Sequence, residues 1–198
     1  MKHIIRQYKL EPGALEVQYI EEEFEEFRGR KKTVAEIVTR LKDREHLILL
    51  SMAPTPDGDD HLVPVSFKVG HELRLTESDP NLAELVHELK GHVTFPDRKI
   101  FYSWIGGTRR QWRGQRHYRA LTEQQEEWAL RNGYHEIVVK TKNKFYEMRA
   151  TLDHLRFNVI KVSRNPEDNC ESKVYLSKII KAELLQQHRT ERRMVGTA

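Results

Sequence analysis

Residues 101–121 read FYSWIGGTRRQWRGQRHYRAL and contain the pattern that decides the fold. The apolar residues of 99–105 predict a β-strand, and the GGT tripeptide at 106–108 is expected to end it. An arginine-rich loop follows, and a helix is predicted to run from there to Asn132, because Asn132-Gly133 is a typical C-terminal stop. Phosphate groups bind well at a helix N-terminus, where unpaired N–H groups and the helix dipole attract negative charge. The segment is therefore a candidate anion site, and a solvated basic loop is the alternative interpretation.

The rest of the chain predicts an α/β protein built on a mixed sheet of about six to seven strands flanked by helices. Thr33 followed by Glu36 is a capping box that marks one helix start, and Pro64 suggests that its strand begins only after it. The pattern predicts one domain over residues 1–181, followed by a basic C-terminal tail at 182–198 that is helical or disordered. Apolar spacing and turn signals predict strands at 3–9, 46–52, 62–69, 99–105, 136–141, 157–163 and 173–180. Helices are predicted at 14–27, 33–41, 80–89 and 145–155, besides the helix that follows the arginine-rich loop and ends at Asn132.

Composition narrows the class of protein. The 198 residues are 38% hydrophobic and 32% charged, with a formal net charge of +4, which is typical of a globular protein with a heavily charged surface. No apolar run approaches the roughly 20 residues of a membrane span, and the N-terminus lacks a signal-peptide layout, so we expect a cytoplasmic protein with no membrane partner. Cys170 is the single cysteine, so neither an internal disulfide nor a thiolate zinc site is expected. His87 and His92 are five residues apart, which puts them on different helix faces and argues against a metal site.

The order of segments resembles that of the GNAT superfamily of N-acetyltransferases, whose pyrophosphate loop reads Arg/Gln-x-x-Gly-x-Gly/Ala. Residues 113–121, RGQRHYRAL, resemble this loop, and FYSWIGGT at 101–108 is similar to the family's fourth strand. Residues 133–148 resemble its fifth strand and following helix, residues 152–162 its sixth strand, and VSFKVG at 65–70 its third strand. The resemblance covers about 47–180 and implies a GNAT-like fold.

Three residues depart from the family pattern. Arg116 and Tyr118 stand where the loop has glycine or alanine, and Arg156 stands where glycine precedes Phe157. Glycine serves such positions because it accepts a positive φ or lets the backbone approach a ligand closely. We expect Arg116 either to contact the pyrophosphate or to turn outward to solvent.

The resemblance implies the activity as well as the fold. The family transfers an acetyl group from acetyl-CoA to a primary amine, by direct attack of the amine on the thioester, and the acceptor here is either a small molecule or a protein. Backbone groups near the end of the fourth strand would hold the pantetheine arm and polarise the acetyl carbonyl, the loop would hold the pyrophosphate, and one asparagine would flank the arm. The implied cofactor-binding residues are Ile105, Gly106, Gly107, Thr108, Arg113, Gly114, Gln115, Arg116, His117, Tyr118, Arg119 and Asn143.

The chemistry also needs proton transfer at two points. The family often uses a tyrosine where this chain has Leu152, so Tyr146 on the same helix is the substitute candidate for the proton donor. A packing role is the alternative for that tyrosine. His71 and Glu72 follow the third strand and are candidate bases by location, and the alternative for both is a solvated strand end. The glutamates of 21–26 suggest a preference for a cationic acceptor, or simply a solvated helix face.

Two other functions stay open. A GNAT-like domain that binds CoA or a partner without turnover would fit the three departures and the missing tyrosine. A nucleic-acid-binding module could use the arginines of 109–119 and the basic tail, but a net charge of +4 argues against it. Composition also leaves a homodimer open.

Overall fold

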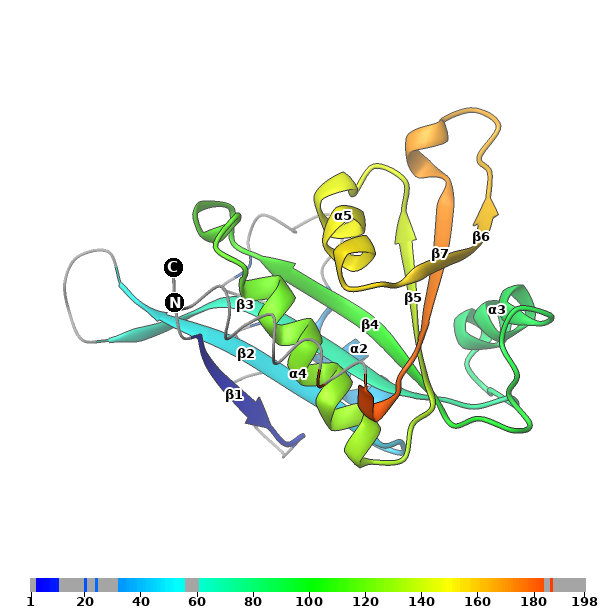
Figure 1. Ribbon diagram of the computed structural model, residues 1–198, viewed down its shortest axis with the longest axis horizontal. Coiled ribbons are helices and arrows are strands. Elements are labelled where there is room, and N and C mark those ends of the chain that lie inside the picture. Colours follow the sequence, from blue (N-terminus) through cyan, green and yellow to red (C-terminus); the bar gives the residue numbers. More distant parts are fainter. Residues whose placement is uncertain are drawn as a thin grey trace. The chain divides into compact units, whose positions relative to one another are not determined.

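The computed structural model describes residues 3–10, 20, 24, 32–55, 61–183 and 186 (Figure 1). Hydrogen bonding places seven strands in one sheet in the order β1-β2-β3-β4-β5-β7-β6. The pairings β1–β2, β2–β3, β5–β7 and β6–β7 are antiparallel, whereas β4 and β5 run parallel. This mixed α/β sheet confirms the predicted fold class. The strands are β1 (Ile4–Tyr8), β2 (His46–Pro54), β3 (Leu62–Leu73), β4 (Ile100–Thr108), β5 (Glu136–Lys142), β6 (Asn158–Ser163) and β7 (Lys173–Ile179), and the helices are α2 (Val34–Leu41), α3 (Pro80–Leu89), α4 (His117–Arg131) and α5 (Tyr146–His154).

The chain divides into two compact units. Unit 1 comprises residues 1–71 and 105–125, and unit 2 comprises residues 72–104 and 126–198. Both β4 and α4 begin in one unit and end in the other. The single domain predicted over 1–181 stays a prediction, and the predicted tail at 182–198 lies largely outside the described residues, as does the predicted helix at 14–27 with its glutamates.

In unit 1 the sequence explains both the helix and the strands. Thr33 caps α2 in the predicted capping box with Glu36, whose backbone N–H donates to the threonine hydroxyl at 3.2 Å. The helix buries Ile37 and Leu41, and the β2 residues 47–50 are at most 1% exposed. Burial of apolar side chains of this size contributes about 1.5–3 kcal/mol each.

In unit 2 a helix inserted between β3 and β4 covers part of the sheet. Asp79 caps α3 by accepting from the backbone N–H groups of Asn81 and Leu82, and Pro80 occupies the first helical position. The apolar face of α3 packs into a core shared with β4, β5 and β7, which comprises Leu73, Leu82, Leu85, Val86, Leu89, Val93, Ile100, Tyr102, Val138 and Tyr175.

Two predicted strand ends are wrong. Strand β3 includes Pro64, which pairs with Met52 where the register shifts, so the missing proline N–H falls at an irregularity of the ladder. Strand β4 does not break at the two glycines but runs on to Thr108. The physical reason is contact with β3, because the Ser66 hydroxyl donates to the carbonyl of Gly107 at 2.9 Å.

Candidate functional site

The C-terminal end of β4, residues Ile105–Thr108, forms the first part of the candidate site. Gly106 is exposed and lies tightly against β3, since a Cβ at this position would be 3.0 Å from the carbonyl oxygen of Phe67. Beyond the strand, the backbone N–H of Arg109 donates to the carbonyl of Val65 at 3.0 Å. These contacts hold the last residues of β4 in an extended conformation. The parallel ladder with β5 joins residues 100–103 to residues 136–139, so the strand continues past its paired stretch.

The loop between β4 and α4 supplies arginines and two left-handed backbone positions. A short 3-10 turn at Arg110–Trp112 leads to Gly114 and Arg116, which have φ values of +74° and +66°. Arg116 therefore takes a left-handed conformation, which glycine adopts without strain. Its side chain is exposed, and the choice between contact with a pyrophosphate and an outward orientation stays a prediction. Arg113 is also exposed, and its Nε donates to the carbonyl of Thr108 at 3.3 Å.

Helix α4 begins directly after this turn, and its N-terminus can bind an anion. The backbone N–H of Ala120 donates to the carbonyl of Arg116 at 3.0 Å, so the N–H groups of the three preceding helical residues have no carbonyl within the helix. The first turn carries no acidic residue that would compete for these donors. The exposed arginines of the loop and the positive end of the helix dipole together suit a phosphate or pyrophosphate group.

His117, the first residue of α4, is buried within unit 1, and its ring lies edge-on to that of the loop residue Trp112 at a centroid distance of 5.9 Å. Its Nδ1 lies 2.9 Å from the Ser51 hydroxyl, and its ring packs edge-on against His3 at a centroid distance of 4.7 Å. Burial, and secondarily the charge of His3, lowers the pKa of His117 to about 4. The imidazole is therefore neutral at pH 7 and adds no charge to the helix N-terminus. Its structural role is to anchor the first turn of α4 on β2.

Tyr118 also turns inward, so it does not crowd the outer face of the loop. Its hydroxyl accepts a hydrogen bond from Lys68 Nζ at 3.0 Å, and the ammonium lies 4.2 Å from the ring centroid. Lys68 itself is 1% exposed. Burial raises the pKa of Tyr118 well above its usual value. A Cβ on Gly106 would lie 3.3 Å from the Tyr118 ring, so the glycine on β4 provides the space that the large residue on α4 occupies.

The remaining loop residues have structural partners of their own. Arg119 pairs with Glu123 one turn later, with Nε and Oε1 2.9 Å apart. The Gln115 carbonyl accepts from His3 Nε2 at 2.8 Å, and its side-chain amide donates to the carbonyl of Gln111 at 3.3 Å. The loop is therefore held in place from both sides before any ligand binds.

The predicted catalytic residues and the asparagine lie in unit 2. Tyr146 is the first residue of α5 and is 62% exposed. Glu72 accepts from Arg74 Nε at 2.8 Å, and this hydrogen bond raises the pKa of the arginine. Asn143 follows β5, where its side-chain amide donates to the carbonyl of Asn169 at 3.2 Å and its Oδ1 accepts from Arg149. His71, the other candidate base, is completely buried in unit 1.

The sequence did not reveal the contribution of Lys68, because a lysine in a strand is usually solvent-facing. The structure reveals it, because residues 64–71 are all buried although they contain Lys68 and His71. Among the residues that the structure describes, no group of three histidine, cysteine or acidic side chains could hold a metal ion, and no helix is both long and apolar enough to cross a bilayer.

Comparison of the fold with solved structures gives a consistent result. A chain of the NatC complex bound to Gag peptide and CoA aligns over 89% of this chain and 99% of its own length, with a TM-score of 0.61 and 12% identity. NAA60 from Arabidopsis thaliana, solved with acetyl-CoA, aligns over 89% of this chain and 99% of its own length, with a TM-score of 0.62 and 10% identity. The ribosomal-protein-S18-alanine N-acetyltransferase from Escherichia coli aligns over 90% of this chain and 95% of its own length, with a TM-score of 0.57 and 14% identity.

No protein-family model matches the sequence, and neither does any curated protein. The structural matches nevertheless cover nearly the whole of this chain, and they include a putative acetyltransferase of the GNAT family from Desulfovibrio desulfuricans. The chain has the fold of the GNAT superfamily of N-acetyltransferases.

Proposed function

We propose that this protein transfers an acetyl group from acetyl-CoA to a primary amine of a small molecule or a protein. The observation that carries the proposal is the left-handed backbone of Arg116 directly before α4. The family pattern has glycine at this position, and glycine adopts the left-handed conformation without strain. The GNAT fold and the CoA-bound structural neighbours support the same function.

The residues of unit 1 fit the nucleotide end of the cofactor. The helix N–H groups at 117–119 and the exposed Arg113 would hold the pyrophosphate. Because Tyr118 packs against Gly106 and Lys68, its ring leaves the outer face of the loop accessible. The departures from the family loop are therefore compatible with binding.

Acetyl-CoA supplies an activated thioester, and the protein positions it, accepts a proton from the amine and donates one to the departing thiolate. In the proposal, the backbone of residues 105–108 orients the pantetheine arm and meets the developing oxyanion, and Asn143 flanks the arm. Tyr146 is the proposed proton donor, since its exposed phenol is free to reach a ligand. Glu72 is the proposed base, and its ion pair with Arg74 would have to open for it to accept a proton.

The test measures thermal stability with acetyl-CoA and CoA, followed by thiol release over a panel of primary amines. A ligand at about 100 times its dissociation constant adds about 2.7 kcal/mol, which raises Tm by several degrees for a chain of this size. We expect stabilisation by both CoA species and thiol release with at least one amine. Absence of any shift would refute the proposal, and a shift without thiol release over the whole panel would identify a CoA-binding domain that does not turn over.

Two variants assign the proton-transfer roles. Tyr146→Phe and Glu72→Gln should each lower kcat by about 10²–10⁴-fold with little change in CoA affinity. Glu77→Gln is the matched control for the second, because that glutamate also contacts Arg74, accepting from its backbone N–H at 2.9 Å. If Glu77→Gln lowers kcat as much as Glu72→Gln does, the effect reports the local structure around Arg74 rather than a base.

A further inference from the structure

Strands β5, β7 and β6 gather lysines on one face of the sheet in unit 2. Residues directly opposite each other in neighbouring strands share a face, and Tyr175 on β7 lies opposite both Lys140 on β5 and Lys161 on β6. Lys173 precedes the tyrosine by two residues, so it points to the same side. Tyr175 belongs to the core into which α3 packs, and this face is therefore the one that α3 covers.

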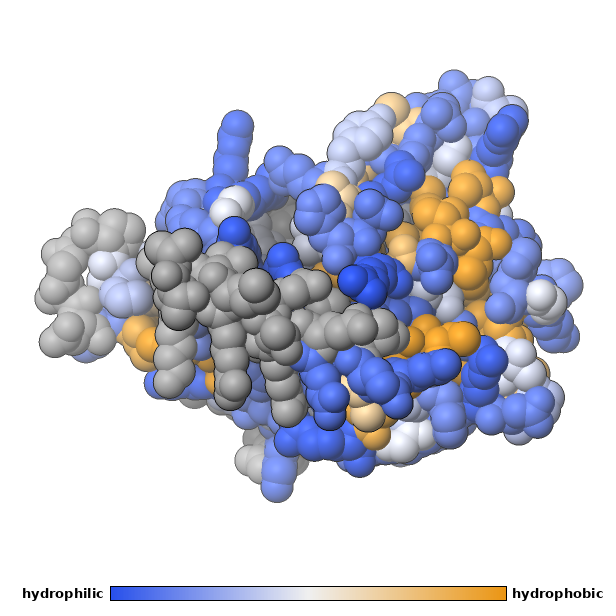
Figure 2. Space-filling view, viewed as in Figure 1, coloured by the Kyte–Doolittle hydropathy of each residue, from blue (hydrophilic) through white to orange (hydrophobic). Residues whose placement is uncertain are grey.

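The other face of the same strands carries apolar side chains. Val159 and Val162 on β6 lie opposite Leu176 and Val174, which alternate with Tyr175 along β7. The two β6 valines are 50% and 49% exposed, and Figure 2 shows hydrophobic surface in the region of β6 and β7. The two faces of the sheet thus differ in character, and the lysines lie on the one that α3 covers.

Helix α3 brings two carboxylates to the lysines, one helical turn apart. Glu84 pairs with Lys173, with Oε1 and Nζ 2.9 Å apart. Glu88 pairs with Lys161, with Oε2 and Nζ also 2.9 Å apart. Three lysines therefore meet two carboxylates, and both carboxylates are engaged by lysines other than Lys140.

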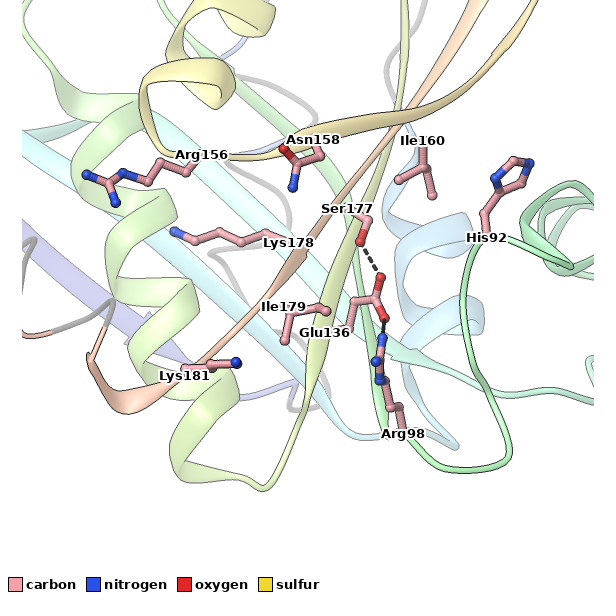
Figure 3. Close-up of a pocket in the computed structure, with 10 residues that line it drawn as sticks. All are labelled: His92, Arg98, Glu136, Arg156, Asn158, Ile160, Ser177, Lys178, Ile179 and Lys181. Carbon is pink, nitrogen blue, oxygen red and sulfur yellow. Dashed lines mark hydrogen bonds and ion pairs between the residues drawn. The ribbon is translucent and has the colours of Figure 1, made fainter.

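The carboxylate at the start of β5 does not compensate the third lysine either. Glu136 lies on the same face four residues before Lys140, a distance of roughly 13 Å along a strand, and it lines a surface pocket. Figure 3 shows this glutamate joined to Arg98 and Ser177, and its Oε2 accepts from the arginine at 2.9 Å. Its charge is thus balanced by an arginine of its own.

Lys140 is left as the amine without a hydrogen bond or ion pair among the residues that the structure describes. Tyr175, directly opposite, has a buried hydroxyl that makes no hydrogen bond. The side chain of Lys140 is half-buried. Burial, and secondarily the charge of Lys173, lowers the pKa of Lys140, whereas the two α3 carboxylates act in the opposite direction. Lysines that are desolvated or lie beside another cation are the ones that act as nucleophiles in proteins.

We propose that Lys140 is a site of covalent acylation by small acyl thioesters. The neutral Nζ attacks the carbonyl carbon of the thioester, a C–N bond forms, the C–S bond breaks, and the departing thiolate takes up the proton that the nitrogen loses. Acetylation removes the charge of Lys140 and leaves two lysines for the two carboxylates of α3. The site uses none of the residues of the cofactor loop and does not rest on the proposed transferase activity.

Acylation rates of individual lysines, measured on the full chain by peptide mass spectrometry, test the proposal. The probe is S-acetyl-N-acetylcysteamine, a thioester that lacks the nucleotide for the cofactor loop, and the internal reference is Lys90, an exposed lysine at the C-terminal end of α3. At about pH 7.5 we expect Lys140 to react at least about threefold faster, because lowering the pKa of an amine enlarges its neutral fraction. This advantage should shrink as the pH rises and the reference amine also becomes neutral. A rate equal to or below that of Lys90, or a ratio that grows with pH, would overturn the proposal.

A pair of lysine variants completes the test. Lys173→Met removes the neighbouring charge and leaves Glu84 for Lys140, so acylation of Lys140 should slow by at least about threefold. Lys181→Met alters an exposed lysine outside the cluster and should leave the rate unchanged. An unaltered rate in Lys173→Met, or an equal loss in Lys181→Met, would contradict the assignment. A preference for Lys140 that persists in urea would assign the reactivity to the local sequence instead of the folded cluster and would also overturn it.

The two proposals of function fail separately. Arg113→Ala alters the cofactor loop and should leave the acylation rate of Lys140 unchanged. Absence of acetyl-CoA binding would refute the transferase and leave these rates unaffected.

Discussion

The ion pair between Lys178 and Glu126 gives the sharpest prediction about stability. Their Nζ and Oε2 atoms are 2.5 Å apart, and the two side chains are 2% and 0% exposed. Breaking a buried pair by removing one partner leaves an uncompensated charge in a low-dielectric interior and costs about 3–5 kcal/mol. Lys178→Met should therefore lower the free energy of unfolding by this amount, which is a large share of the roughly 5–15 kcal/mol that stabilises a typical protein.

The double variant Glu126→Leu/Lys178→Met separates the charge effect from packing. It removes both charges and is expected to be neutral or more stable than the native protein, because the desolvation of the two ions is no longer required. Urea unfolding monitored by circular dichroism measures all four corners of the cycle, and the coupling between the two positions should be several kcal/mol. Lys173→Met is the matched control, since its pair with Glu84 is 43% and 49% exposed and should contribute less than about 1 kcal/mol. A loss below about 1 kcal/mol for Lys178→Met would refute the reasoning.

Three further predictions follow from unit 1. Arg116→Gly should raise the free energy of unfolding by about 0.5–1 kcal/mol, because a left-handed arginine costs roughly 1–2 kcal/mol and the greater chain entropy of glycine offsets part of the relief. Chemical denaturation measures this change, and a destabilised variant would contradict the prediction. Burial holds the pKa of His117 at about 4, below its usual 6.5, so the free energy of unfolding should fall by up to about 3 kcal/mol as the pH falls from 6.5 to 4. His117→Gln should remove that part of the pH dependence in denaturation curves. An unchanged pH profile in the variant would contradict the prediction. Gly106→Ala should lower the free energy of unfolding by about 1–3 kcal/mol, because the added Cβ would lie 3.0 Å from the Phe67 carbonyl oxygen. Thermal unfolding measures this loss, and a neutral substitution would show that β4 shifts freely.

Local patterns predicted most of the fold because they depend on near neighbours in the chain. Helical spacing and capping residues located α2 and α3, and alternation and turns located the strands. Arg116 and Arg156 stand where the family pattern has glycine, and both have a positive φ in the structure. The sequence identified these departures from the pattern but not the backbone conformation of either arginine. The continuation of β4 through Gly106 was not predictable in this way, because it depends on the pairing partner in β3.

The candidate site also depends on contacts between residues that are distant in sequence. The basic loop and the helix start were visible in the sequence, but the direction of Tyr118 was not. Its ring turns inward because Lys68, fifty residues away in sequence, donates a hydrogen bond to it and Gly106 makes space. The engagement of Glu72 with Arg74 was equally invisible to a motif comparison. Contacts of this kind decide which proposed residues can act, and only the three-dimensional structure provides them.

Isothermal titration of acetyl-CoA into the native protein and into Arg113→Ala tests the central proposal most directly. A charge-assisted hydrogen bond contributes about 1.5–3 kcal/mol, so the variant should bind at least tenfold more weakly. Arg164→Ala, which alters an exposed arginine outside the loop, should bind like the native protein. We predict saturable binding of one acetyl-CoA per chain with this order of affinities. No binding to the native protein, or equal binding by Arg113→Ala, would contradict the assignment of the β4–α4 segment as the cofactor site.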